Sequence, residues 1–126
     1  MSDYPGLHEP ESKLTRETLD QHRALRSLME ELEAVDWYAQ RVDATDDEEL
    51  KAVLAHNRDE EKEHAAMVLE WLRRRDPIFD RHLRTYLFTT KSIVEIEEEV
   101  EGGGEGEERA PRPADDLGIG DRRQGA

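Results

Sequence analysis

A row of residues spaced by four and three positions in the middle of the chain is apolar at both ends and polar at its centre. Its members are Leu50, Leu54, Asn57, Glu61, His64, Val68 and Trp71. This spacing places them on one face of a helix, which we expect to run from Thr45 to about Arg75. Burying an unpartnered carboxylate costs several kcal/mol even after relaxation. We therefore expect something at this face to bind the carboxylate of Glu61.

Glu61 and His64 form a Glu-x-x-His pair, so a carboxylate and an imidazole lie one helical turn apart and can share a metal ion. A carboxylate partner occurs in the preceding helix, which we expect from about Ser12 to Ala44. One apolar stripe there is Leu25, Leu28, Leu32, Val35, Ala39 and Val42, and beside it run Leu28, Glu31, Val35, Tyr38 and Val42. Glu31 is the one charged member. Taken alone, Glu31 bends outward into solvent like its neighbours, but the polar centre of the second helix favours a shared site.

The ends of the helices are marked by residues that cap them. Thr45 and Glu48 have the spacing of a capping box, and the short turn before them predicts an antiparallel hairpin. Asp76 followed by Pro77 predicts the start of a shorter helix that ends near Phe88. Residues 92–100 form a further amphipathic segment. The fold class is therefore all-α.

The C-terminal part of the chain changes in composition. Residues 101–116 are rich in Gly, Glu and Pro and are expected to be a disordered acidic linker. Residues 117–126 begin with Leu117-Gly118-Ile119-Gly120, either a frayed terminus or a docking peptide on a tether. The predicted organisation is a flexible N-terminus over 1–11, a helical domain over 12–100, the linker and this peptide.

Composition limits the classes of function. Of the 126 residues, 35% are hydrophobic and 40% are charged, against roughly 45–50% and 25% in ordinary globular domains. The core of one chain is therefore thin, and we expect its helices to pack against a second copy. A net charge of −14 argues against nucleic acid or an anionic membrane as partner.

The absence of cysteine leaves carboxylate, imidazole and phenol groups as the available metal ligands. No apolar run approaches the roughly 20 residues that cross a bilayer, and the N-terminus lacks the apolar core of a signal peptide. We expect a soluble, cytoplasmic protein.

A di-iron carboxylate bundle takes one Glu from each of two helices and a Glu-x-x-His from each of the other two. This chain supplies half of that set as Glu31, Glu61 and His64. Two copies related by a two-fold axis supply all of it. The prediction is a dimer that forms a ferritin-like four-helix bundle, with two metal ions between its subunits.

Four segments resemble the encapsulated ferritin family. They are residues 30–38 (EELEAVDWY), 56–67 (HNRDEEKEHAAM), 71–74 (WLRR) and 83–88 (LRTYLF), and the similarity extends over roughly residues 12–90. The sequence LGIG at 117–120 is similar to the peptide that directs such cargo into an encapsulin shell.

This resemblance implies a ferroxidase with its two-iron centre at a dimer interface, in an open decameric ring that leaves mineral storage to an encapsulin nanocompartment. Glu31, Glu61 and His64 correspond to the iron ligands, with Glu61 bridging the two ions. Tyr38 and Trp37 correspond to residues beside the ligands, and Glu30 and Glu33 to the route by which metal reaches them. His56 is a weaker candidate for the surroundings of the site.

Oxygen and nitrogen ligands suit Fe(II), and the same set should bind Zn(II) at least as tightly, so zinc should inhibit. Two other functions remain open at this point. One is a non-enzymatic acidic helical adaptor, which binds no metal. The other is a di-iron peroxidase, which turns over peroxide rather than dioxygen.

Overall fold

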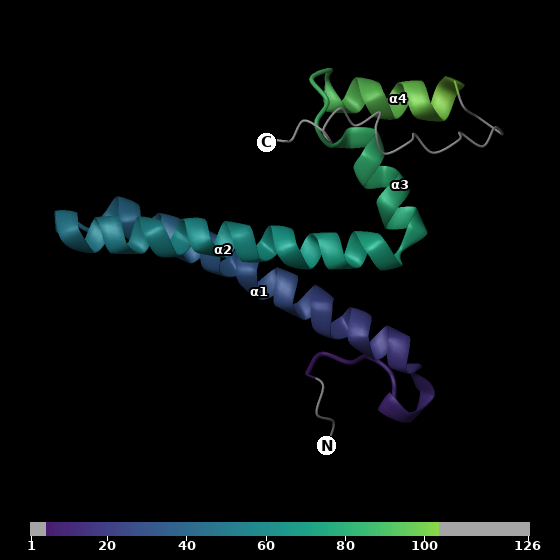
Figure 1. Ribbon diagram of the computed structural model, residues 1–126, viewed down its shortest axis with the longest axis horizontal. Coiled ribbons are helices and arrows are strands. Elements are labelled where there is room, and N and C mark those ends of the chain that lie inside the picture. The colour runs from purple at the N-terminus through teal and green to yellow at the C-terminus, as the bar shows by residue number, and fades with distance from the viewer. Residues whose placement is uncertain (1–4, 104–126) are drawn as a thin grey trace. The chain divides into compact units, whose positions relative to one another are not determined.

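The computed structural model describes residues 5–103 as a set of helices joined by short turns (Figure 1). A 3-10 helix, η1 (Glu11–Lys13), precedes four α-helices: α1 (Arg16–Ala44), α2 (Glu48–Arg75), α3 (Pro77–Tyr86) and α4 (Ile93–Gly103). The described part contains no strand, which confirms the all-α class. None of its helices is both long and apolar enough to cross a membrane. The predicted targeting peptide at 117–126 and residues 104–116 of the predicted linker lie outside the described residues, whereas residues 101–103, predicted as the start of that linker, are the last turn of α4.

The helices divide into two compact units that separate between Arg75 and Asp76. In the first unit, α1 and α2 pack along each other as an antiparallel hairpin (Figure 1). In the second, α3 contacts α4. The predicted hairpin and the short helix that follows it are therefore present.

The start of α1 is set by its N-cap Thr15, and the helix begins at Arg16, four residues after the predicted start at about Ser12. The Thr15 hydroxyl accepts a hydrogen bond from the backbone N–H of Thr18 at 3.0 Å, which satisfies one of the free donors of the first turn. The preceding residues form η1 instead. Further upstream, the ring Nε2 of His22 lies 2.7 Å from the carbonyl oxygen of Pro5, so this contact holds the N-terminal segment against α1.

The predicted capping box at the start of α2 is wrong. The helix begins at Glu48, and the carboxylate of Asp47 accepts from the N–H of Leu50 at 2.9 Å. Thr45 instead accepts from the N–H of Asp47 at 3.2 Å. Two side chains therefore share the capping. Thr45 stabilises the turn, and Asp47 caps the start of α2.

The packing face of α1 is the stripe that contains Glu31. Its members Leu28, Glu31, Val35, Tyr38 and Val42 are all partly buried. The other predicted stripe is not covered as a whole, because Leu25 and Leu32 are 44% and 54% exposed. On α2, Leu54, Asn57, Glu61, Val68 and Trp71 are partly buried as predicted. The other two members of the predicted stripe are exposed, Leu50 at 47% and His64 with 46% of its side chain accessible.

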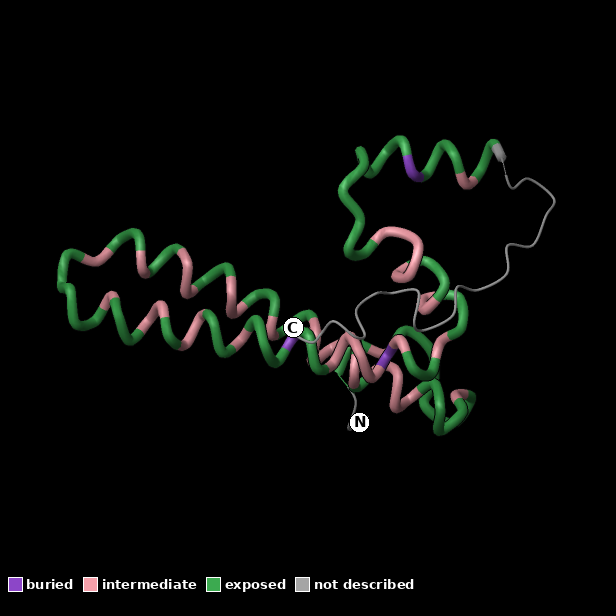
Figure 2. The backbone as a smooth tube through the Cα atoms, turned by 45° about the horizontal axis from the view of Figure 1, so that its top comes forward, coloured by how far each residue is buried: buried purple, intermediate pink, exposed green. Residues whose placement is uncertain are grey.

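The core of a single chain is small. Figure 2 shows partly buried positions alternating with exposed ones along both long helices. Among the described residues, the buried hydrophobic side chains are Ala65 and Leu72 in α2 and Ile96 in α4. Such shallow burial agrees with the low apolar content and leaves much hydrophobic surface uncovered.

Helix α3, the first helix of the second unit, begins where the sequence predicts and ends earlier than predicted. The carboxylate of Asp76 accepts from the N–H groups of Ile78 and Phe79, each at 3.0 Å. Helix α3 ends at Tyr86 rather than near Phe88, because the backbone of Leu87 is already extended, with φ of −70° and ψ of 146°. The next residue, Phe88, has a left-handed backbone with φ of 63°. Ser92 then accepts from the N–H of Glu95 at 3.3 Å at the start of α4.

Candidate metal centre

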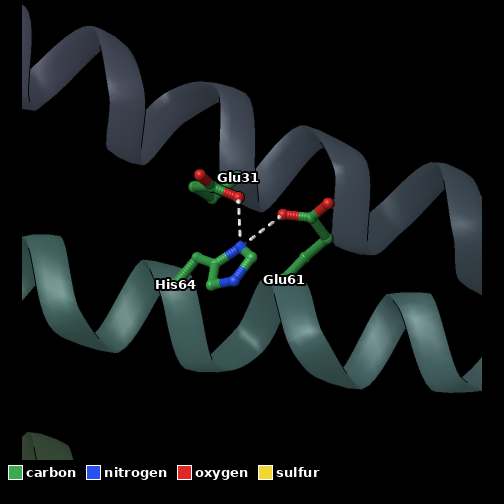
Figure 3. A group of neighbouring side chains, drawn as sticks. All are labelled: Glu31, Glu61 and His64. Atoms are coloured by element: carbon green, nitrogen blue, oxygen red, sulfur yellow. Dashed lines mark hydrogen bonds and ion pairs between the residues drawn. The ribbon is translucent and has the colours of Figure 1, made fainter.

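Glu31 of α1 and Glu61 and His64 of α2 come together on the facing sides of the hairpin (Figure 3). Each offers one ligand atom, and these three atoms all lie within 4.8 Å of one another. The Nδ1 atom of His64 is 3.3 Å from Oε1 of Glu61 and 3.7 Å from Oε1 of Glu31. One ion of ordinary size can therefore reach two carboxylates and an imidazole at this point.

Local helix geometry explains this convergence. Glu61 and His64 are three residues apart in α2, so their side chains leave the same face. Glu31 lies on the packing face of α1, where an antiparallel partner brings it opposite the centre of α2. The neighbouring Ala65 is 8% exposed, and its small side chain allows the two helices to approach closely beside the ligands.

The three groups perturb one another's protonation. A hydrogen bond with Glu61, together with partial burial, raises the pKa of Glu31 above 4.5. The same bond, with help from His64, lowers the pKa of Glu61. The hydrogen bond to Glu61 and the charges of Glu31 and Glu60 raise the pKa of His64 above 6.5. A cation that binds here must displace any proton held on these ligand atoms.

The centre is open on one side. The side chains of Glu31 and Glu61 are 26% and 24% exposed, whereas that of His64 is 46% exposed. Three protein ligands leave coordination positions of an iron ion unfilled. A site of this kind can accept further ligands from water, from a small oxidant or from another protein chain.

The other predicted site residues lie apart from this group. Tyr38 is two turns further along α1, roughly 10 Å at 1.5 Å per residue, and the guanidinium of Arg41 lies 5.5 Å from its ring centroid. Trp37 is 49% exposed. Glu30 and Glu33 are both exposed on α1, where they add negative charge near the ligands without joining them.

Sequence reasoning missed Glu60. Its Oε1 atom lies 3.9 Å from Nε2 of His64, the ring nitrogen that points away from Glu31 and Glu61. Its Oε2 atom lies 3.9 Å from Nε2 of His56. The available signal was the i, i+4 spacing of His56, Glu60 and His64, which puts all three on one ridge of α2.

Comparison with known proteins finds a matching family model and several similar proteins. The family model described as EncFtn-like matches residues 6–90. The chain is 63% identical over 101 residues to the "Encapsulated ferritin-like protein" of Rhodospirillum rubrum, covering 80% of this chain and 71% of that protein. It is 59% identical over 112 residues to the "Ferritin-like protein" of Thermotoga maritima, covering 89% and 93%.

Two further matches extend the comparison. The chain is 42% identical over 96 residues to the "Encapsulin nanocompartment cargo protein EncC" of Myxococcus xanthus, covering 74% of this chain and 73% of that protein. Among solved structures, protein ne0167 from Nitrosomonas europaea is similar with a TM-score of 0.69 and 67% sequence identity. That match covers 70% of this chain and 97% of the other.

Proposed function

The chain belongs to the EncFtn-like family, and from that premise we propose that it is a ferroxidase, which oxidises Fe(II) to Fe(III) at a two-iron site between two copies of the chain. The observation that carries the proposal is the convergence of Glu31, Glu61 and His64, with ligand atoms within 4.8 Å of one another. Carboxylate and imidazole ligands suit Fe(II), and anionic oxygens favour the higher charge of Fe(III).

A second copy is needed because one chain holds half of a di-iron carboxylate set. The surface beside Glu31 supports such pairing. Leu25, Met29 and Leu32 are spaced by four and three residues on α1 and are 44%, 56% and 54% exposed. They form an apolar ridge next to the open centre, and burying it against a partner would stabilise a dimer. A two-fold axis near His64 would bring the two half-sites together.

Each group of residues then has its own proposed role in the oxidation of Fe(II). The carboxylates of Glu31 and Glu61 would neutralise the charge of the iron ions, and Glu61 would be the carboxylate shared between them. Two Fe(II) ions would each give one electron to a single dioxygen molecule, which takes up two protons from water and leaves as hydrogen peroxide. The open position beside His64 admits the oxidant and releases Fe(III). Glu30 and Glu33 would attract incoming cations, whereas Tyr38 and Trp37, which lie apart from the ligands of their own chain, would act only around the completed two-chain site.

The relatives' names extend the proposal to the cellular setting. One relative is named as encapsulated and another as encapsulin cargo. We infer that this chain is also carried inside an encapsulin shell in the cytoplasm, docked through residues 117–126, with its dimers in a decameric ring. Fe(III) made by the protein would then be stored as mineral in that shell.

An anaerobic Fe(II) titration followed by an air pulse tests the enzyme proposal. We expect about one Fe(II) per chain, bound only by the dimer or a larger assembly and oxidised within the mixing time of the pulse. Glu61→Ala should lose both binding and rapid oxidation. Native mass spectrometry reports the bound iron and the assembly, and absorbance reports Fe(III).

Glu49→Ala is the matched control. It removes the same charge from an exposed position of α2, twelve residues and roughly 18 Å from Glu61, and should behave as the wild type. Equal rates of oxidation by wild type and Glu61→Ala, or the absence of stoichiometric iron binding, would contradict the ferroxidase proposal. The acidic helical adaptor would then be the remaining function. Faster turnover with peroxide than with dioxygen would instead identify a di-iron peroxidase.

A further inference from the structure

The imidazole of His64 has carboxylates at both ring nitrogens. Its Nδ1 faces Glu31 and Glu61 at 3.7 and 3.3 Å (Figure 3). Its Nε2 faces Glu60, whose Oε1 atom is 3.9 Å away. The two nitrogens therefore have different surroundings, a group of candidate ligands on one side and a single carboxylate on the other.

A metal ion held with Glu31 and Glu61 must bind the Nδ1 lone pair of His64. The proton of the neutral ring then sits on Nε2, where it needs an acceptor to hold the ring in this tautomer and orientation. We propose that Glu60 is a positioning residue, which accepts a hydrogen bond from the Nε2–H of His64 and so presents Nδ1 to the metal. This inference rests on the proposed metal site.

The position of Glu60 fits this task. A separation of 3.9 Å is longer than a direct hydrogen bond. Both residues lie on α2 at i, i+4 spacing, however, so a small side-chain rotation closes the gap without moving the backbone. The side chain of Glu60 is 49% exposed, which leaves it free to make that rotation.

His56 supports the same arrangement from the far side. Its Nε2 atom lies 3.9 Å from Oε2 of Glu60, so the two oxygens of this carboxylate face two different imidazoles. The three residues form one ridge along α2. Because the side chain of His56 is 71% exposed, we assign it a supporting role in holding Glu60 and not a direct role at the metal.

Zinc affinity can show whether Glu60 acts by orienting His64 or only by its negative charge. Loss of a carboxylate that orients a metal-bound histidine typically weakens metal binding about 10–100-fold. We expect a loss in this range for Glu60→Ala, measured by competition with a chromophoric zinc chelator. Glu60→Gln keeps an oxygen acceptor but no charge, and should recover most of the affinity. Glu63→Ala removes an equal charge from the exposed residue next to His64 and should bind zinc nearly as the wild type does.

A second measurement reports directly which ring nitrogen of His64 carries the proton. In zinc-loaded protein labelled with 15N histidine, long-range 1H–15N spectra distinguish which ring nitrogen carries the proton. We expect His64 to show a slowly exchanging Nε2–H in the wild type and in Glu60→Gln, and a rapidly exchanging one in Glu60→Ala. A protein that is merely less stable would not show this change at one ring nitrogen.

Three results would overturn the proposal. Wild-type affinity in Glu60→Ala would show that Glu60 is not needed, and equal losses in Glu60→Gln and Glu63→Ala would show that only charge matters. Zinc binding that is absent in the wild type, or unaffected by Glu61→Ala, would remove the metal site itself. The last result defeats the proposed function as well, whereas the first two leave it intact.

Discussion

At the scale of single residues, an ion-pair cluster outside the metal centre lies in the last turns of α2. The carboxylate of Glu70 accepts two hydrogen bonds from Arg73, each at 2.8 Å, and one from Arg74 at 2.8 Å. These guanidinium groups lower the pKa of Glu70 from 4.5 to about 2. They also lie at the C-terminal end of the helix, where positive charge is favoured by the helix dipole.

The pH dependence of stability follows from this shift. A carboxyl whose pKa is lower in the folded state stabilises the fold fully above its unfolded value, and this contribution is lost as the pH falls from about 4.5 to about 2. The side chain is 41% exposed, so we expect a contribution near that of surface ion pairs, about 0.2–1 kcal/mol. Urea unfolding of wild type and Glu70→Gln at several pH values measures it.

Glu70→Gln should be less stable than the wild type at pH 6, and the difference in unfolding free energy should disappear as the pH falls through about 2. Carbon-detected NMR titration of the Glu70 carboxyl gives an independent check. A Glu70 that titrates near 4.5, or a difference between the two proteins that is unchanged by acid, would contradict the assignment.

At the scale of the elements, the start of α2 is the place where the structure departs from the predicted cap. Asp47→Ala removes the acceptor for the Leu50 N–H and should cost about 0.5–2 kcal/mol of unfolding free energy. Thr45→Ala removes only the 3.2 Å contact to the Asp47 N–H and should cost less. Chemical unfolding followed by circular dichroism measures both. A larger loss for Thr45→Ala would restore the capping box that the sequence suggested.

The two long helices and the convergence of Glu31, Glu61 and His64 could be predicted from sequence because both depend on helical spacing, which is fixed along the chain. The choice between Thr45 and Asp47 could not, since both are good caps and the turn decides between them. The end of α3 was missed for a similar reason, because neither the extended backbone of Leu87 nor the left-handed backbone of Phe88 follows a residue preference. The i, i+4 spacing of Glu60 and His64 can be seen in the sequence. Which ring nitrogen of His64 faces which carboxylate cannot, because it depends on the packing of α1 against α2.

At the scale of the whole molecule, the proposed site belongs to a pair of chains, and this can be tested by mixing. In an isologous dimer each copy contributes the same residues to the interface. When wild type and Glu61→Ala are mixed equally and allowed to exchange subunits, only pairs of two wild-type chains keep both copies of Glu61. We then expect about a quarter of the wild-type oxidation rate, measured by absorbance after an air pulse.

A site private to each chain would leave half of the rate in the same mixture. The corresponding mixture with Glu49→Ala should keep the full rate, which controls for damage during exchange. Subunit exchange itself is followed by native mass spectrometry, using the mass difference between the two chains.

The exposure of His64 at the side of the hairpin has one more consequence if the centre is completed by a second chain. A newly made chain, still dilute, would carry its three ligands without being able to run the reaction. Activity would appear only as concentration rises and chains pair, so dilution would act as an off switch. Reactive iron chemistry would thereby be postponed until the protein has gathered where its product can be handled.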